Sequence, residues 1–242
     1  MGEMSTPALG LRLVVALPCE ADPIIRHMVL KPLAGEHPFR IYHDTDRLHW
    51  LIISGVGRHA AGIATAYLAG LSQANKAVGW LNVGVAGHAT ISLGEARAAH
   101  KITDTTLATA YYPPAIFDGI KTEALVTMTE PESLIAARML VDMEGSGFYA
   151  AASNFAPPEL VHCLKIVSDH GVQAGQRFSK TAVALLLEKQ LPTIEAAAEQ
   201  LLDLSHTFAT RWAAPAYLNT ILAEYHFDTK QKGQLRQLLQ RW

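Results

Sequence analysis

The sequence predicts an α/β protein with a mixed sheet that is largely buried, and two observations lead to this prediction. Runs rich in Leu, Val and Ile alternate with helix-like segments over most of the 242 residues. The runs at residues 11–17, 79–86 and 158–169 are apolar almost throughout, which is typical of strands covered on both faces. Strands of this kind need helices around them, so both observations support the same fold class.

The composition supports one domain. Half of the residues are hydrophobic and 17% are charged, so the chain can bury a substantial core. No internal repeat, low-complexity tract or linker rich in Pro, Gly and Ser divides the sequence. We therefore expect a single domain over residues 1–242, with its core at about 11–190 and a helical C-terminal extension at about 191–242.

The N-terminal half is expected to contain most of the sheet. After the strand at 11–17, a loop and a short helix precede two strands joined by a polar turn around Asp46. A glycine turn at 55–57 then opens an Ala-rich helix, and the strand at 79–86 ends in a second glycine turn. Three weaker strand candidates follow, at 95–104, 106–112 and 123–128.

The C-terminal half is expected to be mainly helical. A short helix beginning at Pro131 leads to a strand-like segment at 138–144, and a helix of small residues follows at 145–155. After the strand at 158–169, apolar residues recur at helical spacing from about Arg177 onward. The chain closes with a basic amphipathic segment. The strands and helices thus alternate until the final helical region begins.

Charge and cysteine content exclude several classes of protein. The formal net charge is −2 and no basic stripe is present, so we expect no nucleic-acid partner. Cys19 and Cys163 are far apart and fit no metal spacing, which indicates reduced thiols. The N-terminal segment lacks the basic residues of a targeting signal, and no apolar run is long enough to span a bilayer. We therefore expect a soluble cytoplasmic protein with no membrane partner.

Several other motifs have ordinary structural explanations. GVGRHA follows a strand and opens a helix, as a dinucleotide-binding turn does, but the acidic residue expected about 20 residues later is missing. We interpret it as a tight turn with close helix packing. The histidines and aspartates at 43–49 lack a recognised metal-ligand spacing, so we interpret them as a solvated turn. His59 and His88 follow the glycine turns and could face a site.

Three carboxylates are the most informative residues in the sequence. Glu20, Glu144 and Asp169 each follow the carboxyl end of an apolar run. In an open α/β sheet, ligands bind outside the carboxyl ends of the strands. A single acid in such a place is usually a helix cap or a first-turn charge. Because the pattern repeats at three strand ends, together with the glycine turns GVG and GVAG, we expect a binding site there.

At these positions the sequence resembles a known family. Five segments are similar, in order and separation, to blocks of the nucleoside phosphorylase-like superfamily, and most of all to its methylthioadenosine/S-adenosylhomocysteine nucleosidases: VVALPCEAD, SGVGRHAAG, LNVGVAGHA, VDMEGSGFYAAA and KIVSDH. The resemblance covers about Leu11 to Ala184, and residues 105–130 match poorly. It implies a three-layer α/β/α sandwich around a mixed central sheet, with additional C-terminal helices.

The resemblance implies that the protein breaks the N-glycosidic bond of a purine-type nucleoside. Asp169 would protonate or hydrogen-bond N7 of the leaving base, with Ser168 orienting it. Glu20 would be the general base that activates water at the anomeric carbon. Glu144 would accept hydrogen bonds from the ribose hydroxyls, and Met143 would form an apolar floor below the sugar. The glycine turns would supply further substrate-binding residues, namely Gly57, Val85, Ala86 and Gly87.

Two departures from the family pattern bear on the nucleophile. Family members usually carry Ser at the position of Val85, where the hydroxyl helps to hold water or phosphate. Phosphorylases commonly place Arg at the position of Asn82, and Asn is the residue that nucleosidases have. Both observations favour hydrolysis over phosphorolysis, although Arg58 or Lys165 would be available as a cation for phosphate.

Phosphorolysis is therefore one alternative, and a catalytically weak nucleoside-binding protein is another. Val85 and the poorly matching residues 105–130 favour the binding protein, whereas Glu20 disfavours it, since a pure binder has little reason to keep this residue. The resemblance also implies a homo-oligomer, dimer or larger, with no metal and no cofactor. It leaves open the base and the 5′ substituent of the nucleoside.

Overall fold

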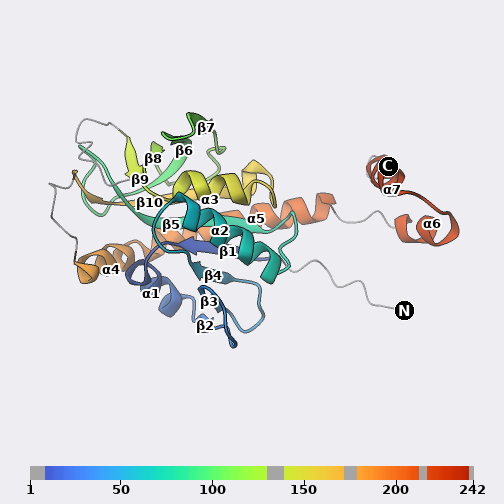
Figure 1. The fold of residues 1–242 in the computed structure, drawn as a ribbon, viewed down its shortest axis with the longest axis horizontal. Helices are drawn as coiled ribbons and strands as arrows, with labels where there is room; N and C mark the ends of the chain where they lie inside the picture. Colours follow the sequence, from blue (N-terminus) through green and yellow to red (C-terminus); the bar gives the residue numbers. More distant parts are fainter. Residues whose placement is uncertain (1–8, 130–138, 172–178, 213–216, 240–242) are drawn as a thin grey trace.

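The computed structural model describes residues 9–129, 139–171, 179–212 and 217–239 (Figure 1). Its elements follow one another in the order β1 (Leu11–Val15), α1 (Pro18–His27), β2 (Lys31–Pro32), β3 (Arg40–His43), β4 (Trp50–Ile53), α2 (Arg58–Leu71), β5 (Gly79–Gly87), β6 (Ala96–Asp104), β7 (Thr109–Tyr111), β8 (Thr122–Thr127), β9 (Leu140–Asp142), α3 (Gly145–Ala152), a 3₁₀ turn (Pro158–Leu160), β10 (Val161–Asp169), α4 (Lys180–Lys189), α5 (Leu191–Trp212), α6 (Leu218–Glu224) and α7 (Thr229–Leu239). The helix predicted from Pro131 lies outside the described residues.

The strands form one mixed sheet, part of which closes on itself. Its centre consists of β4, β1, β5 and β10, which run parallel to one another in this order. Beyond β4, the antiparallel strands β3 and β2 extend the sheet. On the other side β10 pairs with β6, β6 with β8, β8 with β9, and β9 returns to β5. The predicted α/β class and mixed sheet are confirmed, and the barrel-like closure is an addition that the sequence did not predict.

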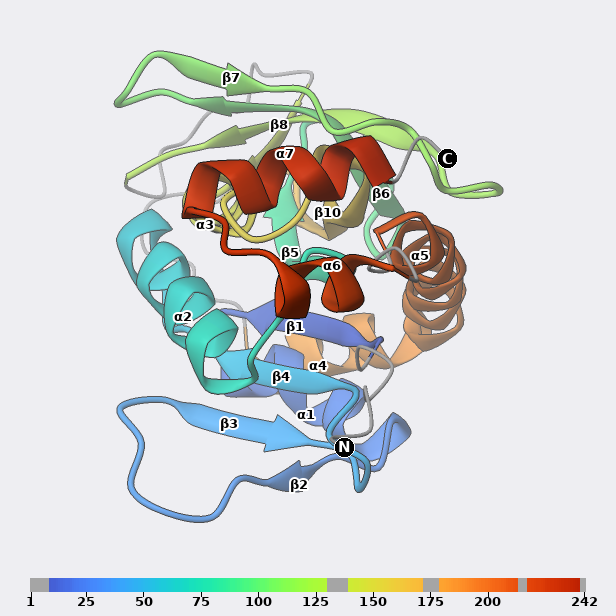
Figure 2. The same cartoon turned by 90° about the vertical axis from the view of Figure 1, so that its right-hand side faces the viewer.

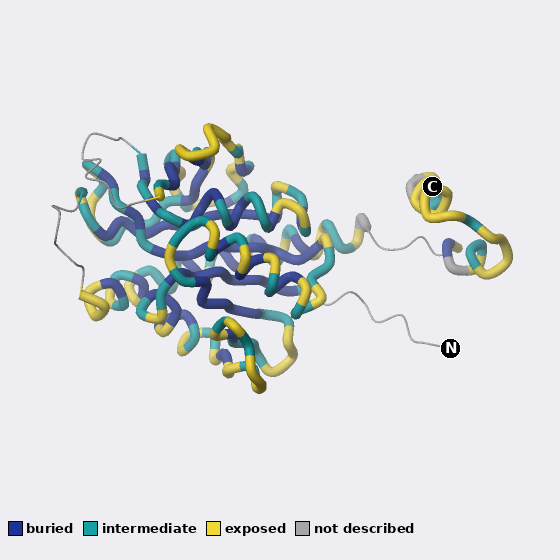
Figure 3. Tube along the Cα trace, in the orientation of Figure 1, coloured by how far each residue is buried: buried dark blue, intermediate teal, exposed yellow. Residues whose placement is uncertain are grey.

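Two groups of helices pack against the sheet. The first group consists of α2 and α3, and the second of α1, α4 and α5. Figure 2 shows α2 and α5 on opposite sides of β1. The most deeply buried backbone, dark blue in Figure 3, is the central strands between these helices. In the part of the chain that the structure describes, no helix is both long and apolar enough to cross a bilayer.

The buried strand β1 contains one charged residue, Arg12, whose side chain holds three parts of the chain together. The Arg12 guanidinium donates to the carbonyl oxygen of Leu48 at 2.7 Å and to Oγ of Ser72 at 2.7 Å. Burial lowers the pKa of Arg12 to about 10, so the residue stays charged at neutral pH. These bonds replace the lost water and connect β1 to the start of β4 and the end of α2.

The close packing of α2 against α3 depends on glycine. A Cβ added to Gly147 would lie 1.9 Å from the carbonyl oxygen of Arg58, and a Cβ added to Gly62 would lie 3.2 Å from the carbonyl oxygen of Gly147. No side chain fits at the shorter distance unless the helices move apart. The interpretation of residues 145–155 as a tightly packed helix of small residues is therefore confirmed for α3.

Replacing Gly147 by Ala should lower the free energy of unfolding by about 1–3 kcal/mol, the usual cost of an extra methyl group in a packed contact. The matched control is Gly70→Ala, because Gly70 lies in α2 and an added Cβ there has no atom within 4 Å. The control should be neutral or stabilising by up to about 1 kcal/mol. Urea unfolding measures both variants, and equal midpoints would contradict the packing argument.

Candidate active site

The three carboxylates singled out in the sequence lie at one edge of the sheet. The strands β1, β5 and β10 are parallel, so their carboxyl ends meet there. Glu20 follows β1 in the first turn of α1, and Asp169 is the last residue of β10. The short strand β9 reaches the same edge, because Val141 pairs with Gly87 at the end of β5, and Glu144 follows β9 two residues later.

Glu20 is held between the start of α1 and the end of β5. Its Oε2 accepts a hydrogen bond from the backbone N–H of Leu17 at 2.9 Å, and this bond caps α1. Its Oε1 accepts from the N–H of Val85 at 2.9 Å. A Cβ at Gly84 would lie 3.0 Å from Oε1, so glycine leaves room for the carboxylate. Burial raises the pKa of Glu20, and the two backbone bonds and the nearby Lys165 oppose this rise.

Glu144 is tied to the glycine turn that precedes α2. Its Oε1 accepts a hydrogen bond from the N–H of Gly57 at 2.8 Å. Gly57 has φ of 104°, a left-handed conformation that favours glycine. Burial, followed by the charge of Asp142, raises the pKa of Glu144 to about 7. A buried carboxyl group with this pKa is common at functional sites.

The charge of Lys165 acts on both of these carboxylates, whereas the sequence suggested this residue only as a cation for phosphate. Lys165 is 1% exposed, and its Nζ lies 2.8 Å from Oδ2 of Asp142. The other carboxylate oxygen of Asp142, Oδ1, accepts a hydrogen bond from Oγ1 of Thr127. Burial alone would lower the pKa of Lys165, but the surrounding groups, with Asp142 first and Cys163 and Glu144 after it, together outweigh this effect, so the pKa lies above its usual value. The charge of Lys165 lowers the pKa of both Glu20 and Glu144. The signal in the sequence is a lysine within the apolar run VHCLKIV.

Asp169 is fixed at the end of β10 by its neighbours. Oγ of Ser168 donates to Oδ2 at 2.8 Å, and the N–H of Gly171 donates to Oδ1 at 2.9 Å. The carbonyl oxygen of Asp169 accepts from the N–H of His88 at 2.9 Å. A Cβ at Gly87 would lie 2.9 Å from Oδ1, so only glycine allows this approach. Each carboxylate oxygen has a second acceptor position, which leaves Asp169 able to bind a ligand.

The structure therefore brings the predicted site residues together in linked groups: Glu20 with Val85, Glu144 with Gly57, and Asp169 with Ser168, Ala86 and Gly87. The side chain of Val85 packs against the hydrophobic core, and its contribution to Glu20 comes from the backbone N–H. Met143 is half-buried, and its contact with a sugar stays a prediction. His59 is exposed.

The two cations considered for phosphate binding are both paired with carboxylates. Nη1 of Arg58 lies 3.0 Å from each carboxylate oxygen of Asp104, and Oγ of Ser146 donates to the same carboxylate at 2.8 Å. Lys165 is paired with Asp142. Both positive charges therefore serve the protein's own ion pairs.

His88 adds a neutral imidazole beside Asp169. Its Nδ1 accepts hydrogen bonds from the N–H groups of Thr90 and Ile91, so the ring proton must be on Nε2. Nε2 is buried and has no hydrogen-bond partner among the described residues. Burial lowers the pKa of His88, which keeps the ring neutral. A buried N–H without a partner suits an acceptor atom that the described protein residues do not supply.

Comparisons with known proteins concern the fold. No protein-family model and no curated protein matches the sequence. The structure resembles MTAN of Chlamydia trachomatis, with 21% sequence identity, a TM-score of 0.61, and coverage of 78% of this chain and 99% of that chain. It resembles 5′-methylthioadenosine nucleosidase of Arabidopsis thaliana, with 18% identity, a TM-score of 0.59 and coverage of 84% and 96%. It also resembles futalosine hydrolase of Helicobacter pylori, with 12% identity, a TM-score of 0.57, and coverage of 83% of this chain and 98% of that chain. At these identities the similarity establishes a shared fold.

The raised pKa of Glu144 predicts that the protein loses stability as the pH rises from about 5 to 7. The pKa is about 7 in the folded chain, against 4.5 for an ordinary Glu. Between these values the folded state keeps a proton that the unfolded chain has lost, so the free energy of unfolding falls with rising pH. The raised pKa of Glu20 acts in the same direction.

Glu144→Gln removes this titration and keeps an oxygen for the N–H of Gly57. The decline in unfolding free energy from about pH 5 to 7 should therefore be smaller in the variant, by on the order of 2 kcal/mol. Urea unfolding at several pH values measures the slope. An identical slope in both proteins would mean that Glu144 is already charged at the lower pH.

Proposed function

We propose that this protein hydrolyses the N-glycosidic bond of a purine-type nucleoside. The observation that carries the proposal is the placement of Glu20, Glu144 and Asp169 at one edge of the sheet, each held by a backbone N–H. The names of proteins with the same fold support it, since they include 5′-methylthioadenosine nucleosidase and futalosine hydrolase. The segments that resemble the nucleosidase family are the ones that contain these carboxylates.

The chemistry assigns a different task to each carboxylate. As the bond between the anomeric carbon and the base breaks, its electron pair moves to the base, which Asp169 would neutralise by giving a proton to N7. The sugar becomes positively charged, and Glu144 would strengthen its hydrogen bonds to the ribose hydroxyls. Water would attack the anomeric carbon and lose a proton to Glu20. The raised pKa of Glu20 makes this carboxylate a stronger base than an exposed Glu.

Hydrolysis is favoured over phosphorolysis by the charges around the site. Arg58 and Lys165 are both neutralised by carboxylates, so neither offers a free cation to a phosphate dianion. Glu20, in the carboxylate form in which it acts as a base, would also repel a phosphate dianion from the anomeric carbon. Water needs no such cation, and Glu20 can accept its proton.

The proposal extends to the coarser properties that the family resemblance implies. We propose a cytoplasmic homo-oligomer with one domain over residues 1–242, and with helices and sheet arranged as a variant of the three-layer α/β/α sandwich. The expected core at about 11–190 and extension at about 191–242 belong to the same proposal.

The direct test is base release from methylthioadenosine, S-adenosylhomocysteine, adenosine and inosine, with and without phosphate. Release that does not depend on phosphate is the expected result. Release that requires phosphate would make the protein a phosphorylase. Binding of the same nucleosides without any release, measured by calorimetry, would favour the weak binding protein that Val85 suggested.

Asp169→Asn should reduce the rate of base release by about 100-fold or more, because the amide cannot give a proton to the base. The matched control is Asp46→Asn, which makes the same chemical change at an exposed position in the turn before β4 and should leave the rate unchanged. Thermal unfolding of both variants checks that they are folded. Turnover within a few-fold of wild type in Asp169→Asn would contradict the assigned role.

A further inference from the structure

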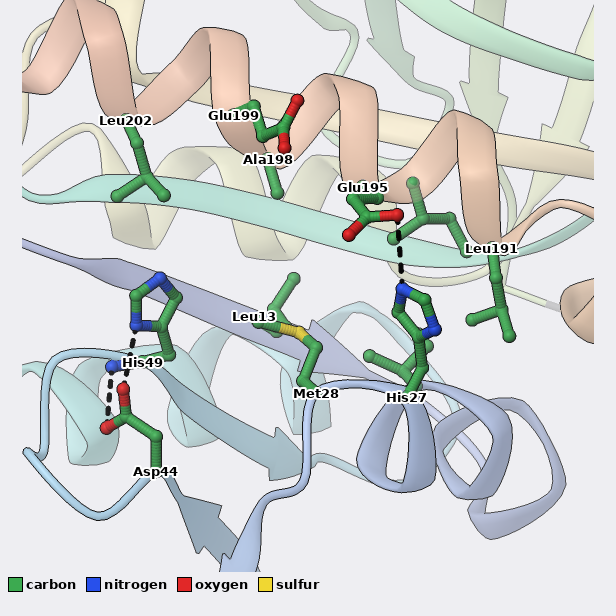
Figure 4. Close-up of a pocket in the computed structure, with 12 residues that line it drawn as sticks. Leu13, His27, Met28, Asp44, His49, Leu191, Glu195, Ala198, Glu199 and Leu202 are labelled. Carbon is green, nitrogen blue, oxygen red and sulfur yellow. Dashed lines mark hydrogen bonds and ion pairs between the residues drawn. The ribbon is translucent and has the colours of Figure 1, made fainter.

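A groove separate from the candidate active site lies between α5, the C-terminal half of α1 and the turn that joins β3 to β4 (Figure 4). It encloses a cavity of about 290 Å³, enough for several side chains. Its floor is apolar and consists mainly of Leu13, Ile24, Met28, Ile194 and Leu202. None of the predicted site residues lines it.

The rim of the groove is acidic, and no Lys or Arg is found among the described residues that line it. Glu195 and Glu199 project from successive turns of α5, and Asp44 lies on the opposite side (Figure 4). His27 lies 3.3 Å from Glu195, and His49 lies 2.9 Å from Asp44. Glu199 forms no ion pair with any described residue. An occupant of this groove should therefore combine positive charge with apolar side chains.

The C-terminal helices of the chain have this combination. Figure 1 shows α6 and α7 apart from the sheet and its helices, and the two helices pack against each other. Residues 226–242 contain four basic residues and one acidic residue. Within α7, leucines at 235, 238 and 239 have the spacing of one helix face, and Leu238 is 58% exposed. Tyr217 and Tyr225 beside α6 are also exposed, at 72% and 58%.

We propose that α6 and α7 of one copy occupy the groove of a second copy, and that two copies exchange these helices reciprocally. The basic residues of α7 would meet Glu195 and Glu199, and its leucines would enter the apolar floor. Such an exchange covers both exposed surfaces at once and closes into a dimer with two-fold symmetry. The inference does not depend on the proposed function.

The position of the groove favours a second copy over the helices of the same chain. The groove uses residues 191–202 of α5, whereas α6 begins after the far end of α5 at Trp212. The ten residues of helix between Leu202 and Trp212 correspond to about 15 Å, and Figure 1 shows the end of α5 pointing away from α1 and α4 toward α6. In this arrangement α6 and α7 extend away from the sheet and its helices (Figure 1), where a second copy can receive them.

Charge-reversal variants of the full-length chain test the proposal. Light scattering after size-exclusion chromatography measures the mass of each variant in solution. The wild-type protein should have twice the chain mass of 26.3 kDa. The double variant Glu195→Lys/Glu199→Lys should raise the dissociation constant of the dimer at least tenfold, and Lys230→Glu/Lys232→Glu should do the same. Combining all four substitutions restores opposite charges and should restore the dimer.

The control is Glu36→Lys/Glu188→Lys, which changes the net charge equally at exposed positions away from the groove and should leave the mass unchanged. A monomeric wild-type protein, or a dimer that both charge reversals leave intact, would overturn the proposal. The proposal would also be overturned if the protein is a monomer whose C-terminal helices become sensitive to protease only in Glu195→Lys/Glu199→Lys. The helices would then occupy the groove of their own chain.

Discussion

The buried ion pair between Lys165 and Asp142 is the interaction on which the candidate site depends. Removing each charge from water costs several kcal/mol, and only a close partner with further hydrogen bonds offsets this cost. Asp142 meets that requirement, since Lys165, Thr127 and the backbone of Gly145 all bind its oxygens. The same ammonium favours the charged forms of Glu20 and Glu144. Without it, two like charges would share an apolar environment, and both groups would hold their protons more tightly.

The closed part of the sheet brings this ion pair and the glycine turns into contact. Strand β10 pairs with both β5 and β6. From β6 the sheet continues through β8 and β9 and returns to β5, so this part of it is closed. This return places Asp142 beside Lys165 and Glu144 beside Gly57. The glycine contact between α2 and α3 acts in the same direction, since α3 starts directly after Glu144 and α2 directly after Gly57. Sheet closure and helix packing thus both hold Glu144 close to Gly57.

The sequence predicted the parts of the fold that local patterns control. Apolar runs identified β1, β5 and β10, and the repetition of acids at their ends located Glu20, Glu144 and Asp169 at one edge. Closure of the sheet was not predictable, because β9 has three residues and its partners are far away in the chain. The partners of Arg58 and Lys165 were missed for the same reason. Asp104 and Asp142 come from distant strands, and only the three-dimensional arrangement shows that these cations are already neutralised.

The side chain of Glu20 has a structural role as well as the proposed catalytic one. Its carboxylate caps α1 and joins that helix to β5, so selection for a stable fold would preserve it after catalysis was lost. The presence of Glu20 in this chain is therefore weak evidence of activity, although the sequence alone favoured an enzyme on that ground. The side chain of Asp169 is held by Ser168 and Gly171 at the sheet edge, and it caps none of the helices in the described part of the chain. Under the proposed function, a variant of this chain without Asp169 would keep its fold and lose the group that protonates the base.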